Sequence, residues 1–204
     1  MAEMVNSQAV HQNYVAAREA GKFEAGFLET GFDVDEMRDA YHRLLGEHAI
    51  ESASRAEGST LRSISLTHRP HAVNPLYDGN NTQFNPETNE KLFYESEFSE
   101  FNEDFKDTIF YSIYRQMPFR IGRMRLMLLS PLSIYAIHRD SAPRAHIAIT
   151  TNPACFLMSG SGETSHVPTD GNVHIFDTTS PHTAFNASLE NRVHLTMSMA
   201  DEER

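Results

Sequence analysis

The sequence predicts a mainly β domain, a jelly roll or a related two-sheet sandwich, with amino-terminal helices packed on one sheet. The carboxyl-terminal half has the pattern of many short strands, which we place at 121–129, 134–138, 144–150, 154–158, 172–177 and 192–199. Turn-forming pairs separate them, such as Ser130-Pro131, Asn152-Pro153 and Asp170-Gly171. The amino-terminal half instead shows the three- and four-residue steps of amphipathic helices.

Length, charge and cysteine usage favour one cytoplasmic domain. A chain of 204 residues suffices for one complete core. Lys and Arg number 17 against 28 Asp and Glu, and the basic residues form no dense run, so we expect no nucleic acid or membrane partner. Cys155 is the only cysteine, which fits a reducing compartment. No stretch approaches the roughly 20 apolar residues that a spanning helix needs. The expected partner is a small molecule or a protein.

Residues 1–56 are expected to form a helical amino-terminal cover. Residues 8–20 are rich in good helix formers and are followed by Gly21, a plausible helix end. A second helix should begin near Asp33 and carries an apolar stripe of Val34, Met37, Tyr41, Leu44 and Leu45. The small, polar segment 51–59 predicts a loop.

Residues 57–118 are expected to hold one strand, a long loop and a helix. A two-residue alternation starts at Leu61 and stops at Pro70, which predicts a strand. Turn formers fill 71–92, and long structured loops of this kind often cover binding sites. A helical face then follows, with acidic residues toward its start; we assign its apolar residues to the core, namely Phe98, Phe101, Phe105, Ile109 and Ile113.

Residues 119–199 are expected to form the jelly-roll core, and two of its strands predict a polar inner lining. Arg144 and His146 share one face of their strand, because side chains alternate along a strand. Arg192, His194 and Thr196 likewise share a face, opposite apolar residues. Buried arginines are rare unless paired, and neighbouring strands offer few acids. An anionic ligand would compensate their charge.

Three residues in this region suggest a metal site. His138 and Asp140 occupy alternate positions, so their side chains would converge on one face of a strand. His182 lies far along the chain, where a later strand could return beside the first. Two imidazoles and one carboxylate make up the facial triad of non-haem Fe(II) oxygenases. Arg192 lies further along, and its guanidinium could hold a carboxylate through two parallel hydrogen bonds.

Taken together, these segments resemble the aspartyl/asparaginyl β-hydroxylase branch of the Fe(II)/2-oxoglutarate-dependent oxygenases. The resemblance covers about residues 119–199 and rests on four runs: His138-Arg139-Asp140, Arg144-Ala145-His146-Ile147-Ala148-Ile149-Thr150-Thr151-Asn152, His182-Thr183-Ala184-Phe185-Asn186 and Arg192-Val193-His194-Leu195. It implies a double-stranded β-helix in which His138, Asp140 and His182 bind Fe(II). Animal members that hydroxylate EGF-like domains lack the metal-binding carboxylate, so with Asp140 this chain looks more like bacterial and phage relatives.

The resemblance also implies a co-substrate site. Arg192 would pair with the distal carboxylate of 2-oxoglutarate, and His146, together with Arg144 two positions before it, would help to hold the co-substrate. The implied reaction uses O2 to hydroxylate an unactivated C–H bond of an amino acid or a peptidyl Asp/Asn-type substrate, and it releases succinate and CO2.

Two other classes of protein remain possible from the sequence. A cupin-like metalloenzyme that does not use 2-oxoglutarate would share the triad but would not need Arg192. A non-catalytic jelly roll that binds carbohydrate or peptide would need neither Asp140 nor His182. Arg123 and Arg125 either bind a substrate carboxylate or have a structural or solvated role. We expect the remaining histidines of this region to be surface or core residues and not ligands, namely His166, His174 and His194.

Overall fold

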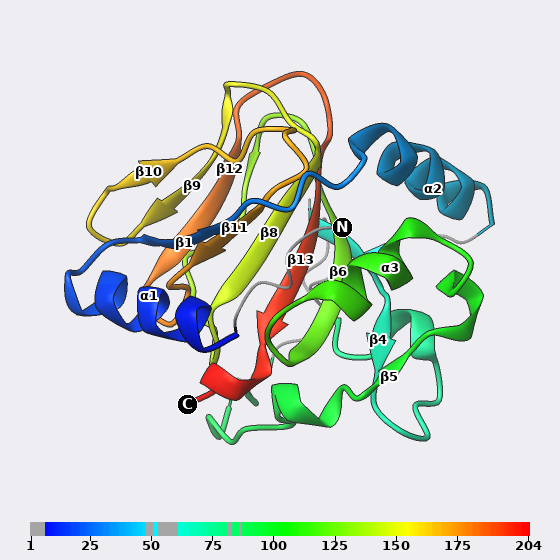
Figure 1. Ribbon diagram of the computed structural model, residues 1–204, viewed down its shortest axis with the longest axis horizontal. Coiled ribbons are helices and arrows are strands. Elements are labelled where there is room, and N and C mark those ends of the chain that lie inside the picture. Colours follow the sequence, from blue (N-terminus) through cyan, green and yellow to red (C-terminus); the bar gives the residue numbers. More distant parts are fainter. Residues whose placement is uncertain (1–6, 48–50, 53–60, 81–82, 86) are drawn as a thin grey trace.

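The computed structural model describes residues 7–47, 51–52, 61–80, 83–85 and 87–204, which form two facing antiparallel sheets with helices on one side (Figure 1). The larger sheet has the strand order β1-β11-β8-β13-β6-β3-β2. Its strands are β1 (Glu24–Leu28), β2 (Glu51–Ser52), β3 (Leu61–Ser65), β6 (Ile121–Leu129), β8 (Arg144–Thr150), β11 (Val173–Phe176) and β13 (Arg192–Met199). This architecture confirms the predicted jelly roll with helices packed on one sheet.

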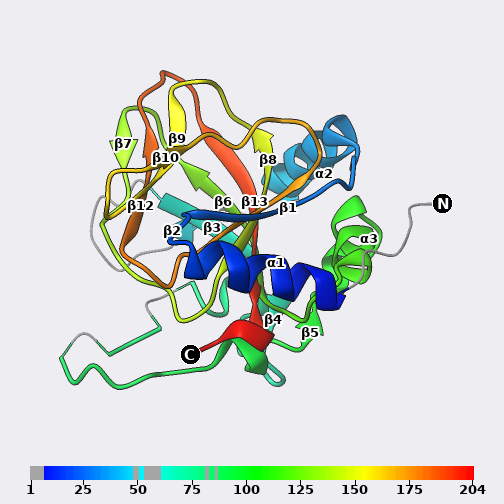
Figure 2. The same ribbon diagram turned by 60° about the vertical axis from the view of Figure 1, so that its left-hand side comes forward.

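The smaller sheet has the order β10-β9-β12-β7. Its strands are β7 (Ser133–Ile134), β9 (Cys155–Ser159), β10 (Thr164–Ser165) and β12 (His182–Asn186). A separate short pair joins β4 (Thr67–His68) to β5 (Glu100–Phe101). Figure 2 shows the smaller sheet at the left and the helices that contain residues 34–47 and 109–116 at the right.

The first two long helices begin and end where the sequence predicts. Helix α1 (Ser7–Glu19) is followed by Gly21, whose φ of 69° is the left-handed conformation that favours glycine at helix ends. Helix α2 (Val34–Glu47) starts after Asp33, whose carboxylate accepts hydrogen bonds from the backbone N–H groups of Asp35 and Glu36. Of the loop predicted over 51–59, residues 53–59 lie outside the described part of the chain.

The predicted helix over 98–113 is wrong in extent but right about its core residues. The structure places η2 (Glu95–Glu97) just before this segment and divides the segment itself into three elements: β5, η3 (Glu103–Phe105) and α3 (Ile109–Gln116). The side chains of Asn102 and Thr108 accept hydrogen bonds from the backbone of Asp104 and Phe110, which starts a new turn at each point. The apolar residues of the predicted face are nevertheless all buried: Phe98, Phe101, Phe105, Ile109 and Ile113.

Other differences concern short elements. The sequence does not predict strand β1, because the alternation of apolar and polar residues over its five positions is too weak to indicate a strand. The strand predicted over 134–138 is reduced to β7, and His138 forms an isolated bridge with His182 instead. The remaining single turns of 3-10 helix are η1 (Pro75–Tyr77) and η4 (Ala200–Glu202). No helix in the described ranges is long and apolar enough to cross a membrane.

The two faces of the larger sheet have different chemistry. Leu195, Met197 and Ile147 belong to the main apolar core, which also contains residues of all three α-helices. On the opposite face of β13, His194 lies beside Met127 of β6 and Ala148 of β8. The polar residues of that face are buried as well, which confirms the predicted polar lining; they include Arg125, Arg144, His146, Arg192 and Thr196.

The apolar face should dominate stability. Leu195 is 0% exposed and Leu189 is 81% exposed, so Leu195→Ala removes core packing while Leu189→Ala removes almost none. We expect Leu195→Ala to lower the free energy of unfolding by about 2–5 kcal/mol. The matched control Leu189→Ala should change it by less than about 0.5 kcal/mol. Chemical denaturation measures both, and equal midpoints for the two variants would contradict this description of the core.

Candidate functional site

The structure brings His138, Asp140 and His182 together. The backbone of His138 exchanges two hydrogen bonds with that of His182, each 3.0 Å long. The N–H of Asp140 donates to the carbonyl of Thr178 at 2.9 Å, so the two segments run side by side. One possible ligand atom from each of the three side chains lies within 4.8 Å of the others. No other such group of three or more His, Cys, Asp or Glu occurs in the described part of the chain.

Hydrogen bonds orient both histidine rings. The Nδ1 atom of His138 lies 2.8 Å from the carbonyl oxygen of Ala136, and that of His182 lies 3.0 Å from the carbonyl oxygen of Ser180. A carbonyl oxygen only accepts, so each Nδ1 carries the proton and each Nε2 keeps a free lone pair. Burial lowers the pKa of His182, which also favours the neutral ring. Metal-binding histidines are usually held in this way.

Asp140 is held as a carboxylate by a neighbouring arginine. The Nε and Nη2 atoms of Arg144 donate to the two oxygens of Asp140 at 3.0 and 2.8 Å. Burial alone would raise the pKa of Asp140, but Arg144, His138 and His182 outweigh it and hold the pKa well below its usual range. Oδ2 of Asp140 lies 3.6 Å from Nε2 of His182. The site therefore presents an anionic oxygen beside a neutral imidazole nitrogen.

Arg144 has a second carboxylate partner that the sequence analysis missed. Nη2 of Arg144 lies 2.9 Å from Oε1 of Glu95, which is completely buried. Glu95 comes from η2, outside the sheet, and also pairs with Arg123 at 2.6 Å. Arg144 therefore has two carboxylate partners, neither of them on a neighbouring strand, and its charge is balanced without the anionic ligand that the sequence suggests. Its predicted role toward the co-substrate remains a prediction.

Arg192 is buried and has no carboxylate partner among the described residues. Its Nη2 donates to Nδ1 of His194 at 2.9 Å, and its Nε has no hydrogen-bond partner. Burial lowers the pKa of Arg192 to about 10, so the side chain is still charged at neutral pH. A buried unpaired cation is costly, so this position suits an anion.

His146 and Arg192 each contact the same residue, His194. The Nδ1 atoms of His146 and His194 are 3.4 Å apart, and the ring of His146 meets Phe176 edge to face. Burial, followed by the charge of Arg192, keeps the pKa of both histidines well below its usual range. His194 is therefore a neutral core histidine, as expected, but it also positions Arg192.

Arg123 and Arg125 have different partners in the structure, whereas the sequence gives no means of distinguishing them. The guanidinium of Arg123 is neutralised by Glu95. Arg125 is buried, its Nε makes no hydrogen bond, and the described residues provide it with no carboxylate. Burial and then Arg123 lower its pKa to about 9. Arg125 is thus a second unpaired cation on the polar face of the sheet.

Other polar residues support or flank the site. The amide of Asn186 donates to the carbonyls of Leu129, Ser130 and Glu190, and so it braces the turn after β12. His174 pairs with Glu24 and Asp170. Neither His174 nor His166 belongs to the group formed by the triad.

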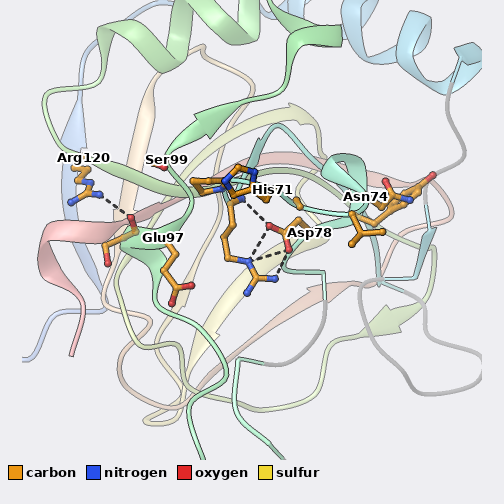
Figure 3. Close-up of a pocket in the computed structure, with 12 residues that line it drawn as sticks. His71, Asn74, Asp78, Glu97, Ser99 and Arg120 are labelled. Atoms are coloured by element: carbon orange, nitrogen blue, oxygen red, sulfur yellow. Dashed lines mark hydrogen bonds and ion pairs between the residues drawn. The ribbon is translucent and has the colours of Figure 1, made fainter.

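A separate cavity of about 750 Å³ lies between the 69–78 loop, residues 96–99 and Arg120 (Figure 3). The ion pair between Arg69 and Asp78, 2.6 Å long, forms part of its wall. No residue of the triad lines this cavity, and neither does Arg192. We therefore do not assign it to the site described above.

Two solved structures share the fold at low sequence identity. One is a prolyl hydroxylase from Trichoplax adhaerens in complex with a peptide fragment of the hypoxia inducible factor oxygen degradation domain. Its TM-score is 0.53 at 9% sequence identity, and the match covers 97% of this chain and 92% of that chain. The other is SnoK, a non-heme alpha ketoglutarate dependent carbocyclase from nogalamycin biosynthesis, with a TM-score of 0.52, 13% identity and coverage of 96% and 87%. At these identities the likeness shows the fold alone.

Sequence comparison identifies the family. A search of curated proteins finds no match. However, residues 94–201, more than half of the chain, match the family described as Aspartyl/Asparaginyl beta-hydroxylase. The matched segment contains the triad, Arg144, His146 and Arg192, and also Glu95. The chain therefore belongs to the aspartyl/asparaginyl β-hydroxylase family.

Proposed function

We propose that this protein is an Fe(II)- and 2-oxoglutarate-dependent dioxygenase that hydroxylates an unactivated C–H bond. The observation that carries the proposal is the approach of ligand atoms of His138, Asp140 and His182 to within 4.8 Å of one another, in a protein that also buries Arg192 without a carboxylate partner among the described residues. Family membership supports the same reaction class. The proposed substrate is an amino acid or a peptidyl Asp/Asn-type residue.

The donor set fits Fe(II). Two neutral imidazoles and one carboxylate are the ligands of the facial triad, which leaves coordination positions open. Asp140 keeps lone pairs for a metal, because each carboxylate oxygen has two and Arg144 uses one on each. The hydrogen bonds to Ala136 and Ser180 fix the two rings with Nε2 available. Bound iron, with 2-oxoglutarate and O2, would supply the oxidising chemistry that yields succinate, CO2 and the hydroxylated product.

The remaining polar residues would hold the two organic substrates. Arg192 would pair with the distal carboxylate of 2-oxoglutarate, with His146 and Arg144 helping to hold it. The unpaired Arg125 is a better candidate than Arg123 for a carboxylate of the prime substrate, because Glu95 already neutralises Arg123.

One alternative function, that of a cupin-like metalloenzyme, would make no use of Arg192. A cupin-like metalloenzyme without 2-oxoglutarate would share the triad, but it would have no reason to bury Arg192 without a carboxylate partner among the described residues. A non-catalytic binding protein would not need three metal-ligand side chains in contact. Both observations favour the oxygenase.

The acidic net charge of −11 and the single cysteine still favour a cytoplasmic protein that does not bind nucleic acid.

Asp140→Ala should abolish Fe(II)-dependent turnover of 2-oxoglutarate, because the metal loses its only carboxylate ligand. The measurement is succinate release after anaerobic reconstitution with Fe(II), followed by addition of O2. Asp170→Ala is the control, because Asp170 is also paired with a histidine but lies outside the triad. Undiminished succinate release by Asp140→Ala would rule out the assigned triad.

Arg192→Ala should raise the apparent KM for 2-oxoglutarate about tenfold or more, because a charge-assisted contact contributes about 1.5–3 kcal/mol. Metal content should stay the same, since Arg192 is not one of the three proposed ligands. Steady-state kinetics and metal analysis test both points, with the exposed Arg120→Ala as control. If co-substrate dependence were unchanged, the alternative without 2-oxoglutarate would be favoured.

A further inference from the structure

Glu95 is a completely buried carboxylate with an unusually full set of partners. It accepts hydrogen bonds from Nε and Nη2 of Arg123 at 3.0 and 2.6 Å, and from the hydroxyl of Ser198 at 2.7 Å. Nη2 of Arg144 lies 2.9 Å away. Burial opposes ionisation, but Arg123 and Arg144 together hold the pKa of Glu95 well below its usual range. Glu95 is therefore an anion shared by two buried guanidiniums.

The same guanidinium connects Glu95 to the triad. Nη2 of Arg144 contacts Glu95 and also donates to Oδ1 of Asp140, while Nε donates to Oδ2. Oδ2 of Asp140 in turn lies 3.6 Å from Nε2 of His182. An uninterrupted chain of charged contacts thus runs from η2 to the proposed metal ligands.

Packing and hydrogen bonds restrict the movement of the segment that carries Glu95. A Cβ atom at Gly122 would lie 2.6 Å from the carbonyl oxygen of Glu95 and 2.6 Å from Oγ of Ser198, so glycine allows η2 to approach strand β6. The N–H of Glu95 donates to Glu203 at 2.7 Å, which fixes the segment from the other side. Glu95 is therefore held from both sides by packing and hydrogen bonds.

We propose that Glu95 is a positioning residue that acts through Arg144 to orient Asp140 and keep its carboxylate available to a metal ion. With Glu95 in place, the guanidinium of Arg144 is shared between two carboxylates. Without it, Asp140 is the one carboxylate left to Arg144, and Arg144 competes more strongly with the metal for the same oxygens. This inference rests on the proposed function, because it concerns the same metal ligands.

The test is the affinity of the metal-free protein for Co²⁺, a spectroscopically visible substitute for Fe(II). Glu95→Gln keeps the shape of the side chain and removes its charge, and we expect it to weaken Co²⁺ binding about tenfold or more. Glu97→Gln is the matched control: Glu97 lies in the same turn, is exposed, and bonds to the N–H of Tyr94. It should bind Co²⁺ like the wild type. In Glu97→Gln, the affinity of the cobalt-loaded protein for 2-oxoglutarate should also be unchanged.

A second variant separates positioning from folding. Glu95→Gln leaves Arg123 buried without its carboxylate, which destabilises the protein. Combining it with Arg123→Met removes that unpaired charge, and we expect the Tm to recover while Co²⁺ affinity stays low. A folded double variant with wild-type affinity would overturn the inference and leave Glu95 a purely structural role. Failure of the wild type itself to bind Co²⁺ or Fe(II) would instead overturn the proposed function.

Discussion

The structure depends on a sheet that is buried on both faces but with a different chemistry on each. Along β6, β8 and β13, side chains alternate between an apolar layer under the helices and a polar layer facing the smaller sheet. A shift of one residue in any strand pairing would exchange the two layers. The register is thus strongly specified, because Leu195 belongs under the helices and His194 and Thr196 do not.

The polar layer contains more buried positive than negative charge. Among the described residues its arginines are Arg123, Arg125, Arg144 and Arg192, while Glu95 and Asp140 are the carboxylates that pair with them. The paired arginines are held by short contacts and make the layer rigid. The other two, Arg125 and Arg192, keep their charge under burial and have no carboxylate partner among the described residues, so they are the proposed anion-binding positions. With paired and unpaired cations on neighbouring positions of β6, β8 and β13, one wall would serve both for support and for the proposed binding of carboxylates.

Local periodicity makes part of the site predictable from the sequence, whereas contacts between distant segments do not appear in it. Alternation is sufficient to place Arg144 and His146 on one face of their strand and Arg192 on the polar face of another, and the spacing of His138 and Asp140 suggests their convergence. Glu95 cannot be found this way, because it stands in a single turn whose sequence resembles the start of an acidic helix. The structure does not form that predicted helix as one piece. The side chains of Asn102 and Thr108 accept backbone hydrogen bonds and so compete with the regular backbone pattern of a helix.

The position of β13 has a consequence for how the chain is assembled. In the sheet it lies between β6 and β8, yet it is the last of the strands in sequence. Until β13 is made by the ribosome, β6 and β8 lack their common neighbour and expose edges that invite pairing with other chains. Such long-range pairing also slows folding. A nascent chain of this protein therefore exposes these two edges until residues 192–199 emerge.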